Sequence, residues 1–294
     1  MKKILLNPWT ALITLILVAG VRFIDPAFVE SVRLRYFDQL IVSQPAVDIP
    51  VHTVNIDEAA LDKYGQFPFP RDIYATIIKD LYKREAGLVV FNILMPEADR
   101  FKQDQTLART MQDLPVVLPA LAHTKQKNEN FGSPVQVVGQ DPAGRVVEYP
   151  GLINNVPAIE KLAAGVGIVN TFPEVDGVMR RMPLVIASQG ALHPAMALEV
   201  LRVAAKDSKV QVKIGDEGVE ALRVPKFGRV NTDNLSRIWI DWSKKPTEHS
   251  LVELPKSFDG AIVIVGLSAQ GLTQPIATAR GEVWPHDAQA SVIG

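Results

Sequence analysis

The chain has 294 residues, of which 47% are hydrophobic and 21% charged, so it can bury a substantial core in one large domain or two modest ones. Its formal net charge is -1, and Lys and Arg are dispersed along it, which argues against a nucleic-acid partner. It contains no cysteine. This excludes disulfides, thiolate metal sites and a cysteine nucleophile, and it is compatible with export.

The amino terminus has the pattern of an export signal. Lys2 and Lys3 precede an apolar run that ends at Ile24. At about 1.5 Å per residue this run is slightly short for a hydrocarbon core of roughly 30 Å, but flanking basic side chains can reach the interface. We expect residues 1–25 to be an uncleaved membrane anchor, with the lysines in the cytoplasm and the rest of the chain outside it. A signal cleaved near Val18-Ala19-Gly20 and a buried soluble helix are the alternatives.

Residues 26–50 are expected to form a juxtamembrane helix and a linker. Pro26 to Ser43 is predicted to be helical because apolar side chains recur at helical spacing, in the line Phe28, Val32, Tyr36 and Leu40. The apolar face of this helix is wider than a helix exposed to solvent on all sides would have, so we expect it to pack on the domain or on a second copy of the chain. Pro45 and Pro50 then bracket a short linker.

Residues 51–294 are predicted to form one extracytoplasmic domain built on the unit from Val51 to Leu94. Val51 to Ile56 has the pattern of a buried strand, an amphipathic helix follows Arg71, and a second buried strand begins after Gly87. This is the order of a β-α-β unit with parallel strands. We therefore predict an α/β fold, with a β-α-β core sheet and flanking helices, that becomes mixed α+β towards the carboxyl terminus.

Further elements follow in chain order. We predict a helix over 104–113, a buried strand over 115–121, a surface hairpin or excursion over 123–150, a helix over 153–164 and a strand over 166–170. Asp176-Gly177 indicates a tight turn into an antiparallel return. A helix over 194–205, a β-rich portion from Val210 and a very apolar strand before Leu267 come next. After Gly271 the residues are small or polar and show no pattern for a further element.

Several charged residues occupy positions where a site could form. Asp57 directly follows the first strand, where it is either a helix N-cap or an acid facing a ligand at the strand's carboxyl end. Arg71 begins a helix and either pairs with Asp57 or Asp72 or holds an anion. Arg180 and its neighbour Arg181 point to opposite faces of a strand. One of the two is expected to pair with Asp176 or Glu174, which leaves the other as a candidate for an anion.

No enzyme motif is complete in the sequence. The residues from Gly266 to Gly271 follow a buried strand as a nucleophile elbow would, but the second glycine is one position late. There is no phosphate-binding glycine loop, and the five histidines have no ligand spacing. We therefore expect no catalytic residues, no metal and no cofactor in this region.

Motifs along most of the chain resemble those of the CHASE2 domain, an extracytoplasmic sensor module of bacterial membrane receptors. They are RLRYFDQL (33–40), VNIDEAAL (54–61), FPFPR (67–71), AGLVVFNILMPE (86–97), GIVNTFPEVDGVMRRMPL (167–184) and IVIVGLSAQGL (262–272). The resemblance implies a membrane helix, this sensor domain, further membrane helices and a cytoplasmic output module. That output is typically an adenylate or guanylate cyclase, a histidine kinase, a Ser/Thr kinase or a diguanylate enzyme.

Two positions depart from the family pattern. Phe67 and Phe69 stand where tryptophans are usual, and Asn92 stands where the second strand usually has an acidic residue. If that acid binds a ligand or a cation, Asn92 weakens the function; if it is a structural hydrogen-bonding position, Asn92 can serve. The residues predicted to bind a ligand are Asp57, Arg71, Asn92, Asp176 and Arg180.

The predicted function is sensing. The domain would face the periplasm or the extracellular side of the bacterial inner membrane and pass a signal through membrane helices to the output module. The expected partners are the membrane, an unknown small-molecule or envelope ligand, and a second copy in a homodimer. The alternatives are an exported solute-binding protein with a cleaved signal and a structural envelope module without an output.

Overall fold

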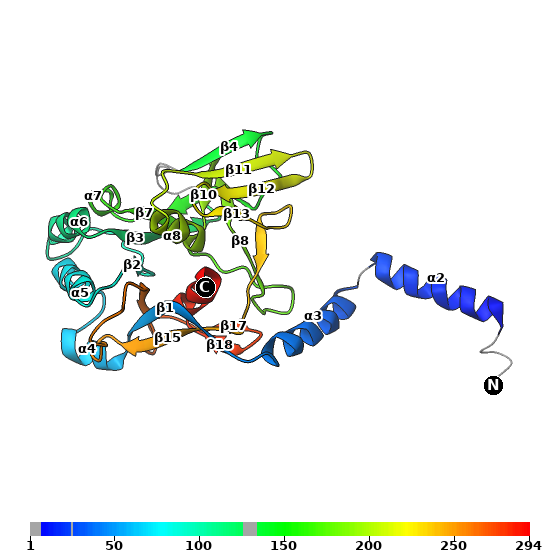
Figure 1. The fold of residues 1–294 in the computed structure, drawn as a ribbon, viewed down its shortest axis with the longest axis horizontal. Coiled ribbons are helices and arrows are strands. Elements are labelled where there is room, and N and C mark those ends of the chain that lie inside the picture. The colour runs from blue at the N-terminus through cyan, green and yellow to red at the C-terminus, as the bar shows by residue number, and fades with distance from the viewer. Residues whose placement is uncertain (1–6, 25, 126–133) are drawn as a thin grey trace.

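In the computed structural model, which describes residues 7–24, 26–125 and 134–294, the chain is organised around one mostly parallel sheet (Figure 1). In spatial order its strands are β15 (Lys244–Ser250), β1 (Val47–Ile56), β16 (Ile262–Leu267), β2 (Leu88–Phe91), β3 (Val116–His123) and β6 (Gly151–Ile153), and β7 (Gly165–Ile168) also pairs with β3. Every one of these pairs is parallel except β3 with β6. The α/β prediction is therefore confirmed.

The predicted β-α-β unit is present, with one strand inserted. β1 and β2 are parallel strands of one sheet, but β16 lies between them and pairs with both. β16 comes from near the carboxyl end of the chain, and its central residues Val263, Ile264 and Val265 have no exposed surface. Such an apolar strand is most stable in the middle of a sheet that is covered on both faces.

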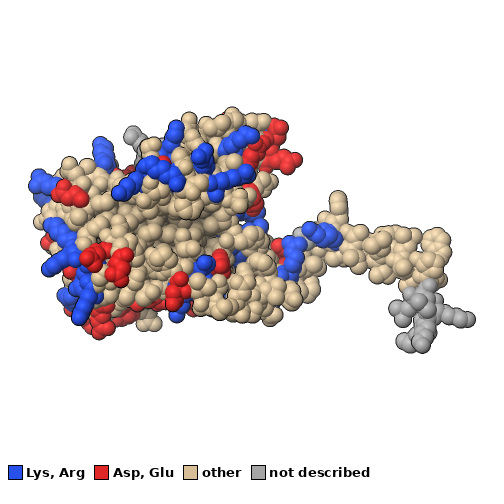
Figure 2. Space-filling model, in the orientation of Figure 1, with Lys and Arg blue, Asp and Glu red and all other residues tan. Residues whose placement is uncertain are grey.

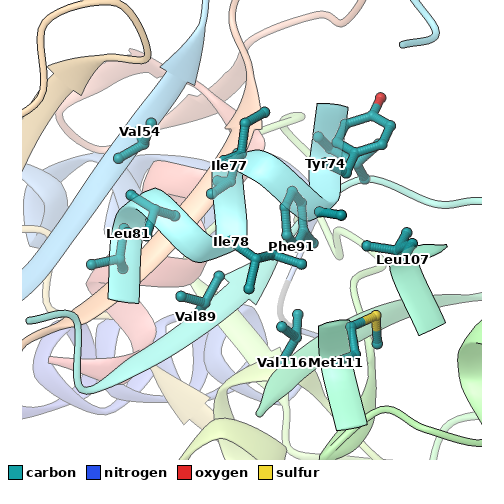
Figure 3. Packing of buried hydrophobic residues seen from close by; sticks show 14 of the residues in the cluster. Val54, Tyr74, Ile77, Ile78, Leu81, Val89, Phe91, Leu107, Met111 and Val116 are labelled. Atoms are coloured by element: carbon teal, nitrogen blue, oxygen red, sulfur yellow. The ribbon is translucent and has the colours of Figure 1, made fainter. Parts of the chain in front are cut away.

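A layer of helices covers one face of the sheet. In the described part of the chain these are α4 (Glu58–Tyr64), α5 (Arg71–Lys83), α6 (Asp104–Asp113) and α7 (Pro157–Glu160). Figure 3 shows how α5 directs Tyr74, Ile77, Ile78 and Leu81 towards the sheet, as its helical period predicts. Leu107 and Met111 of α6 join the same cluster, and all six of these side chains are at most 3% exposed. The predicted helix over 153–164 is reduced to the short α7.

The other face is covered by α8 (Met196–Ala204) and α9 (Pro285–Ile293). Sequence analysis did not predict α9, because the side chains that it buries are small or polar rather than an apolar stripe: Ala288 and Ala290 are at most 1% exposed and Ser291 is 7% exposed. Figure 1 shows α9 in red, within the domain. Gly266 of β16 makes room for it, because a Cβ at this position would collide with the ring of His286.

The remaining strands form smaller sheets beside the main one. The largest has the order β13 (Gly228–Val230), β12 (Gly218–Val224), β11 (Val210–Gly215) and β4 (Val135–Gly139). The others are β10 (Ala191–Pro194), β9 (Val185–Ser188) and β5 (Glu148–Tyr149); β14 (Arg237–Trp239) with β8 (Arg181–Pro183); and β17 (Ile276–Thr278) with β18 (Gly281–Val283). The predicted change to a β-rich portion after Val210 is confirmed.

Two predictions about connections are confirmed only in part. The segment 123–150, of which 126–133 lie outside the described residues, does not form a hairpin of its own: β4 pairs in parallel with β11, and β5 with β9. The turn at Asp176-Gly177 is present, with Gly177 in the left-handed region and its N–H 2.9 Å from the Glu174 carbonyl. Pro173 and Met179 form an antiparallel bridge across this turn, and the Glu174 N–H donates to the Val178 carbonyl at 2.9 Å, so the antiparallel return is confirmed next to the turn. Beyond it, β8 pairs with β14 and β9 with β10, since local turn chemistry does not select distant partners.

Two helices precede the sheet in the described residues, α2 (Pro8–Ile24) and α3 (Ala27–Val42). α2 has no buried residue, and apart from Arg22 in its last turn its side chains are uncharged (Figure 2). Over the described part of the chain no single helix is long and apolar enough to span a membrane; α2 and α3 meet that test only as a bent pair. Lys2 and Lys3, on which the predicted orientation depends, lie outside the described residues.

Candidate functional site

Asp57 lies at the carboxyl end of β1 and caps α4. Its Oδ1 accepts a hydrogen bond of 2.9 Å from the Ala60 N–H, so the N-cap interpretation is confirmed. The next residue, Glu58, accepts a hydrogen bond of 2.8 Å from the Gln270 N–H in the loop after β16. The acidic turn after β1 therefore joins the start of α4 to the loop after β16, at the carboxyl ends of these two strands. Ligand binding by Asp57 stays a prediction.

Arg71 is buried at the start of α5. Its Nη2 donates a hydrogen bond of 3.1 Å to the Glu97 carbonyl, and its Nε lies 3.4 Å from Asp104 Oδ1. The expected partners Asp57 and Asp72 are therefore wrong, and the partner is an acid at the start of α6. Arg71 joins two helix starts and the chain after β2.

Arg180 makes the most extensive ionic contact described in the domain. It is 2% exposed and binds Asp176 with two hydrogen bonds of 2.8 Å. On its other side it donates to both carboxylate oxygens of Asp38 in α3, at 2.8 and 2.7 Å. We call Arg180, Asp38 and Asp176 the Arg180 clamp. Hydrogen bonds to Asp38, and then to Asp176, raise the pKa of Arg180, and its hydrogen bonds lower the pKa of Asp176.

Arg181 faces the opposite way, as the strand alternation predicts. It forms a bidentate pair with Glu174, at 2.6 and 2.8 Å, and its guanidinium lies 5.0 Å from the ring centroid of Trp239. Trp239 in turn contacts Phe37 of α3, with ring centroids 4.8 Å apart. The prediction that one of the two arginines pairs with Asp176 or Glu174 is confirmed. The second arginine is paired as well, so the structure leaves neither of them as the unpaired anion site that was expected, and both arginines lie next to α3.

Sequence reasoning missed Asp38 as a functional residue. A signal was present, because Asp38 lies on the same helical face as Leu34 and Ile41, which pack against the domain. A carboxylate inside an apolar face needs a buried cationic partner. The sequence alone did not show that the partner was Arg180, since the two residues lie far apart along the chain.

Asn92 follows β2 and lines a cavity of about 200 Å³ at the carboxyl ends of β2, β16 and β7. The other lining residues are Leu94, Pro119, Leu121, Val169, Leu267, Thr273, Pro285 and His286. Asp57, Arg71, Asp176 and Arg180 are not among them, so the structure does not bring the five predicted residues together. Ligand binding by these residues stays a prediction.

His286 and Asp287 begin α9 beside this cavity. His286 is fully buried, and its Nε2 lies 2.6 Å from Asn55 Oδ1. Burial lowers the pKa of His286 to about 3 and raises the pKa of Asp287 to about 6. Burial at the contact between α9 and the sheet therefore shifts both side chains towards their uncharged forms, compared with the same groups in water.

Two further histidines lie together on adjacent strands. His52 and His249 have ring nitrogens 2.9 Å apart and stack with an interplanar angle of 10°. Among the described residues no group of three or more His, Asp or Glu side chains could hold a metal ion. The expectation of no metal stays a prediction.

Together these features define an α/β domain attached through an ionic clamp to an amino-terminal helical stem. The model of the CHASE2 domain family matches residues 13–293, and the chain belongs to that family. CHASE2 domains are extracellular sensor domains of signalling receptors, and the domain itself is not catalytic. Searches of curated proteins and of solved structures found no match to the chain.

Proposed function

We propose that this chain is the sensory part of a bacterial membrane receptor and that α3 carries its signal towards the membrane. The observation that supports this most directly is the Arg180 clamp. Two short hydrogen bonds from Arg180 to Asp38 attach α3 to the domain, and two more hold Arg180 on Asp176. Breaking a buried ion pair by removing one partner costs about 3–5 kcal/mol. Separating Asp38 from Arg180 would likewise leave a buried charge without its full set of partners, so we expect α3 to follow movements of the turn that carries Arg180.

A continuous set of contacts leads from the cavity to this clamp. α9, whose first residues line the cavity, directly follows the β17–β18 hairpin. The Met179 N–H donates to Ala277 of that hairpin at 2.9 Å, and Arg180 is the next residue. We propose that a change at the cavity moves α9 and this hairpin, and through them the Arg180 clamp.

The remaining parts of the proposal concern the membrane. Residues 1–25 would anchor the chain, with the domain outside the cytoplasm and an output such as a cyclase or a histidine kinase inside it. The exposed apolar surface of α2 and the family of the domain support this arrangement. Amino-terminal sequencing of the mature protein tests it: an end near Val21 would show a cleaved signal and favour an exported solute-binding or structural protein.

A homodimer through α3 is part of the same proposal. The line Phe28, Val32, Tyr36 and Leu40 remains 49% to 78% exposed, whereas Leu34 on the other side is buried. An exposed apolar stripe on a helix is typical of a helix–helix interface. Light scattering of the full chain in detergent should give a dimer, and Val32→Glu with Tyr36→Glu should give a monomer. A wild-type monomer would refute this part.

The signalling proposal is tested in the complete receptor by replacing Asp38 with Asn. This change removes one charge from the Arg180 clamp while keeping the shape of the side chain. We expect a change in basal output of at least severalfold, and no such change for Asp48→Asn, which alters an exposed acid on β1. An Asp38→Asn receptor that is folded and has the wild-type output would refute transmission through the clamp.

A further inference from the structure

We propose that the cavity beside Asn92 binds a small, uncharged, mainly apolar molecule that carries one hydroxyl group, of about the size of benzyl alcohol. This would be the ligand class of the sensor proposed above. Only the effect of binding on output rests on that proposed function; binding itself does not.

The lining of the cavity excludes a charged ligand. Asn92, Thr273 and His286 are its polar residues, and the other lining residues are apolar: Leu94, Pro119, Leu121, Val169, Leu267 and Pro285. None of these side chains is a carboxylate, an amine or a guanidinium. An ion that leaves water for such a partly open site loses part of its hydration and gains no counter-ion, which is unfavourable.

The polar groups suit a single hydroxyl. Among the residues described, the side-chain amide of Asn92 has no hydrogen-bond partner, so it can both donate to and accept from a ligand. His286 has no exposed surface, and its Nε2 must carry the proton because it donates to Asn55 Oδ1 at 2.6 Å. Its Nδ1 is then a buried acceptor that no described residue satisfies. This Nδ1 atom packs against Gly266, so Asn92 is the side chain that a ligand hydroxyl would pair with.

The volume limits the size of the ligand. A dry apolar cavity of about 150 Å³ in another protein accommodates benzene, so about 200 Å³ corresponds to roughly eight non-hydrogen atoms. The pocket is partly open to solvent, so a larger molecule would place only about this many atoms inside it and extend outwards with the rest. A six-membered ring or a branched chain with one hydroxyl substituent fits both the volume and the polar groups.

Binding would act on α9 directly. Pro285 and His286 form part of the wall, and they begin the helix that packs on β1, β15 and β16. A ligand that fills the cavity would hold this first turn against the sheet. The contacts from α9 to the Arg180 clamp would then make the position of α3 depend on the ligand.

The test titrates the full chain in detergent with four compounds of similar shape, observed by ligand NMR and by the shift of the unfolding temperature. These are benzyl alcohol, toluene, benzoate and benzylamine. We expect saturable binding of benzyl alcohol, at least fivefold weaker binding of toluene, and no saturable binding of the two ions. Failure of benzyl alcohol to bind, or equal binding of benzoate or benzylamine, would overturn the proposal.

Variants locate the site. Asn92→Leu should abolish the preference for benzyl alcohol over toluene, and Asn92→Asp should create binding of benzylamine by adding a carboxylate. Leu121→Trp should fill the cavity and remove binding, with Val169→Phe as a milder filling change if the first variant does not fold. Val138→Trp, at an exposed position on β4, is the matched control and should bind like the wild type. Wild-type binding by a folded cavity-filled variant would refute the assignment.

The two proposals fail in distinguishable ways. If benzyl alcohol binds at the cavity and does not alter the output of the complete receptor, the ligand class stands and transmission from the cavity is refuted. If no compound binds while Asp38→Asn still changes the output, the ligand class is refuted and the role of the clamp stands.

Discussion

Asp287 provides a sharp test of how α9 is held on the sheet. It is 7% exposed, and burial raises its pKa from 3.8 to about 6. The folded protein therefore binds a proton at Asp287 more tightly than the unfolded chain does. This contribution to stability is complete below pH 3.8 and is lost as the pH rises through 6. A difference of about two pKa units, at about 1.36 kcal/mol per unit, corresponds to about 3 kcal/mol.

Asp287→Asn removes this pH dependence because the amide cannot ionise. The variant should be more stable than the wild type by up to about 3 kcal/mol at pH 8, with a much smaller difference at pH 4. His286 acts in the opposite direction, because its lowered pKa of about 3 increases stability as the pH rises. Its Nε2 lies 3.7 Å from Asp287 Oδ1, so the two groups are coupled, and the same comparison in a His286→Ala background separates their contributions.

The assay is urea unfolding of the full chain in detergent, followed by tryptophan fluorescence at pH values from 4 to 8. Glu282→Gln, on the exposed β18 hairpin, controls for the loss of a carboxylate. A stability difference between Asp287→Asn and the wild type that is constant with pH would refute the reasoning. So would a variant that is less stable than the wild type at pH 8.

Three further predictions concern single contacts. Arg180→Met should lower the free energy of unfolding by about 3–5 kcal/mol, since it leaves two carboxylates without a cation, and Arg181→Met should cost less because its pair is more exposed; equal costs in chemical denaturation would contradict this. Gly266→Ala should lower the free energy of unfolding by about 1–3 kcal/mol, because it forces a methyl group against His286. A double-mutant cycle should show a smaller loss in a His286→Ala background. Asp57→Ala should cost about 1 kcal/mol through the lost cap while Asp57→Ser retains most of the stability, and unchanged thermal stability of the Ala variant would contradict the capping role.

The sequence predicted the features that depend on neighbouring residues. The helical period of α5, the apolar runs of β1 and β2 and the N-cap at Asp57 are short-range patterns. The pairing of one arginine with Asp176 or Glu174 was predictable for the same reason, because it joins residues on the two sides of one turn; that both arginines are paired was not predicted. The fold class and the family motifs therefore follow from the order of residues along the chain.

The tertiary structure alone decided the features that join distant segments. β16 lies between β1 and β2, and Asp38 contacts Arg180, although these segments are far apart in the sequence. The entropic cost of closing a loop rises only slowly with its length, so separation along the chain hardly limits which segments pair. α9 is held by packing of small and polar side chains, which leave no amphipathic period to detect. The cavity beside Asn92 exists only because residues from five separated stretches of the chain meet at one edge of the sheet.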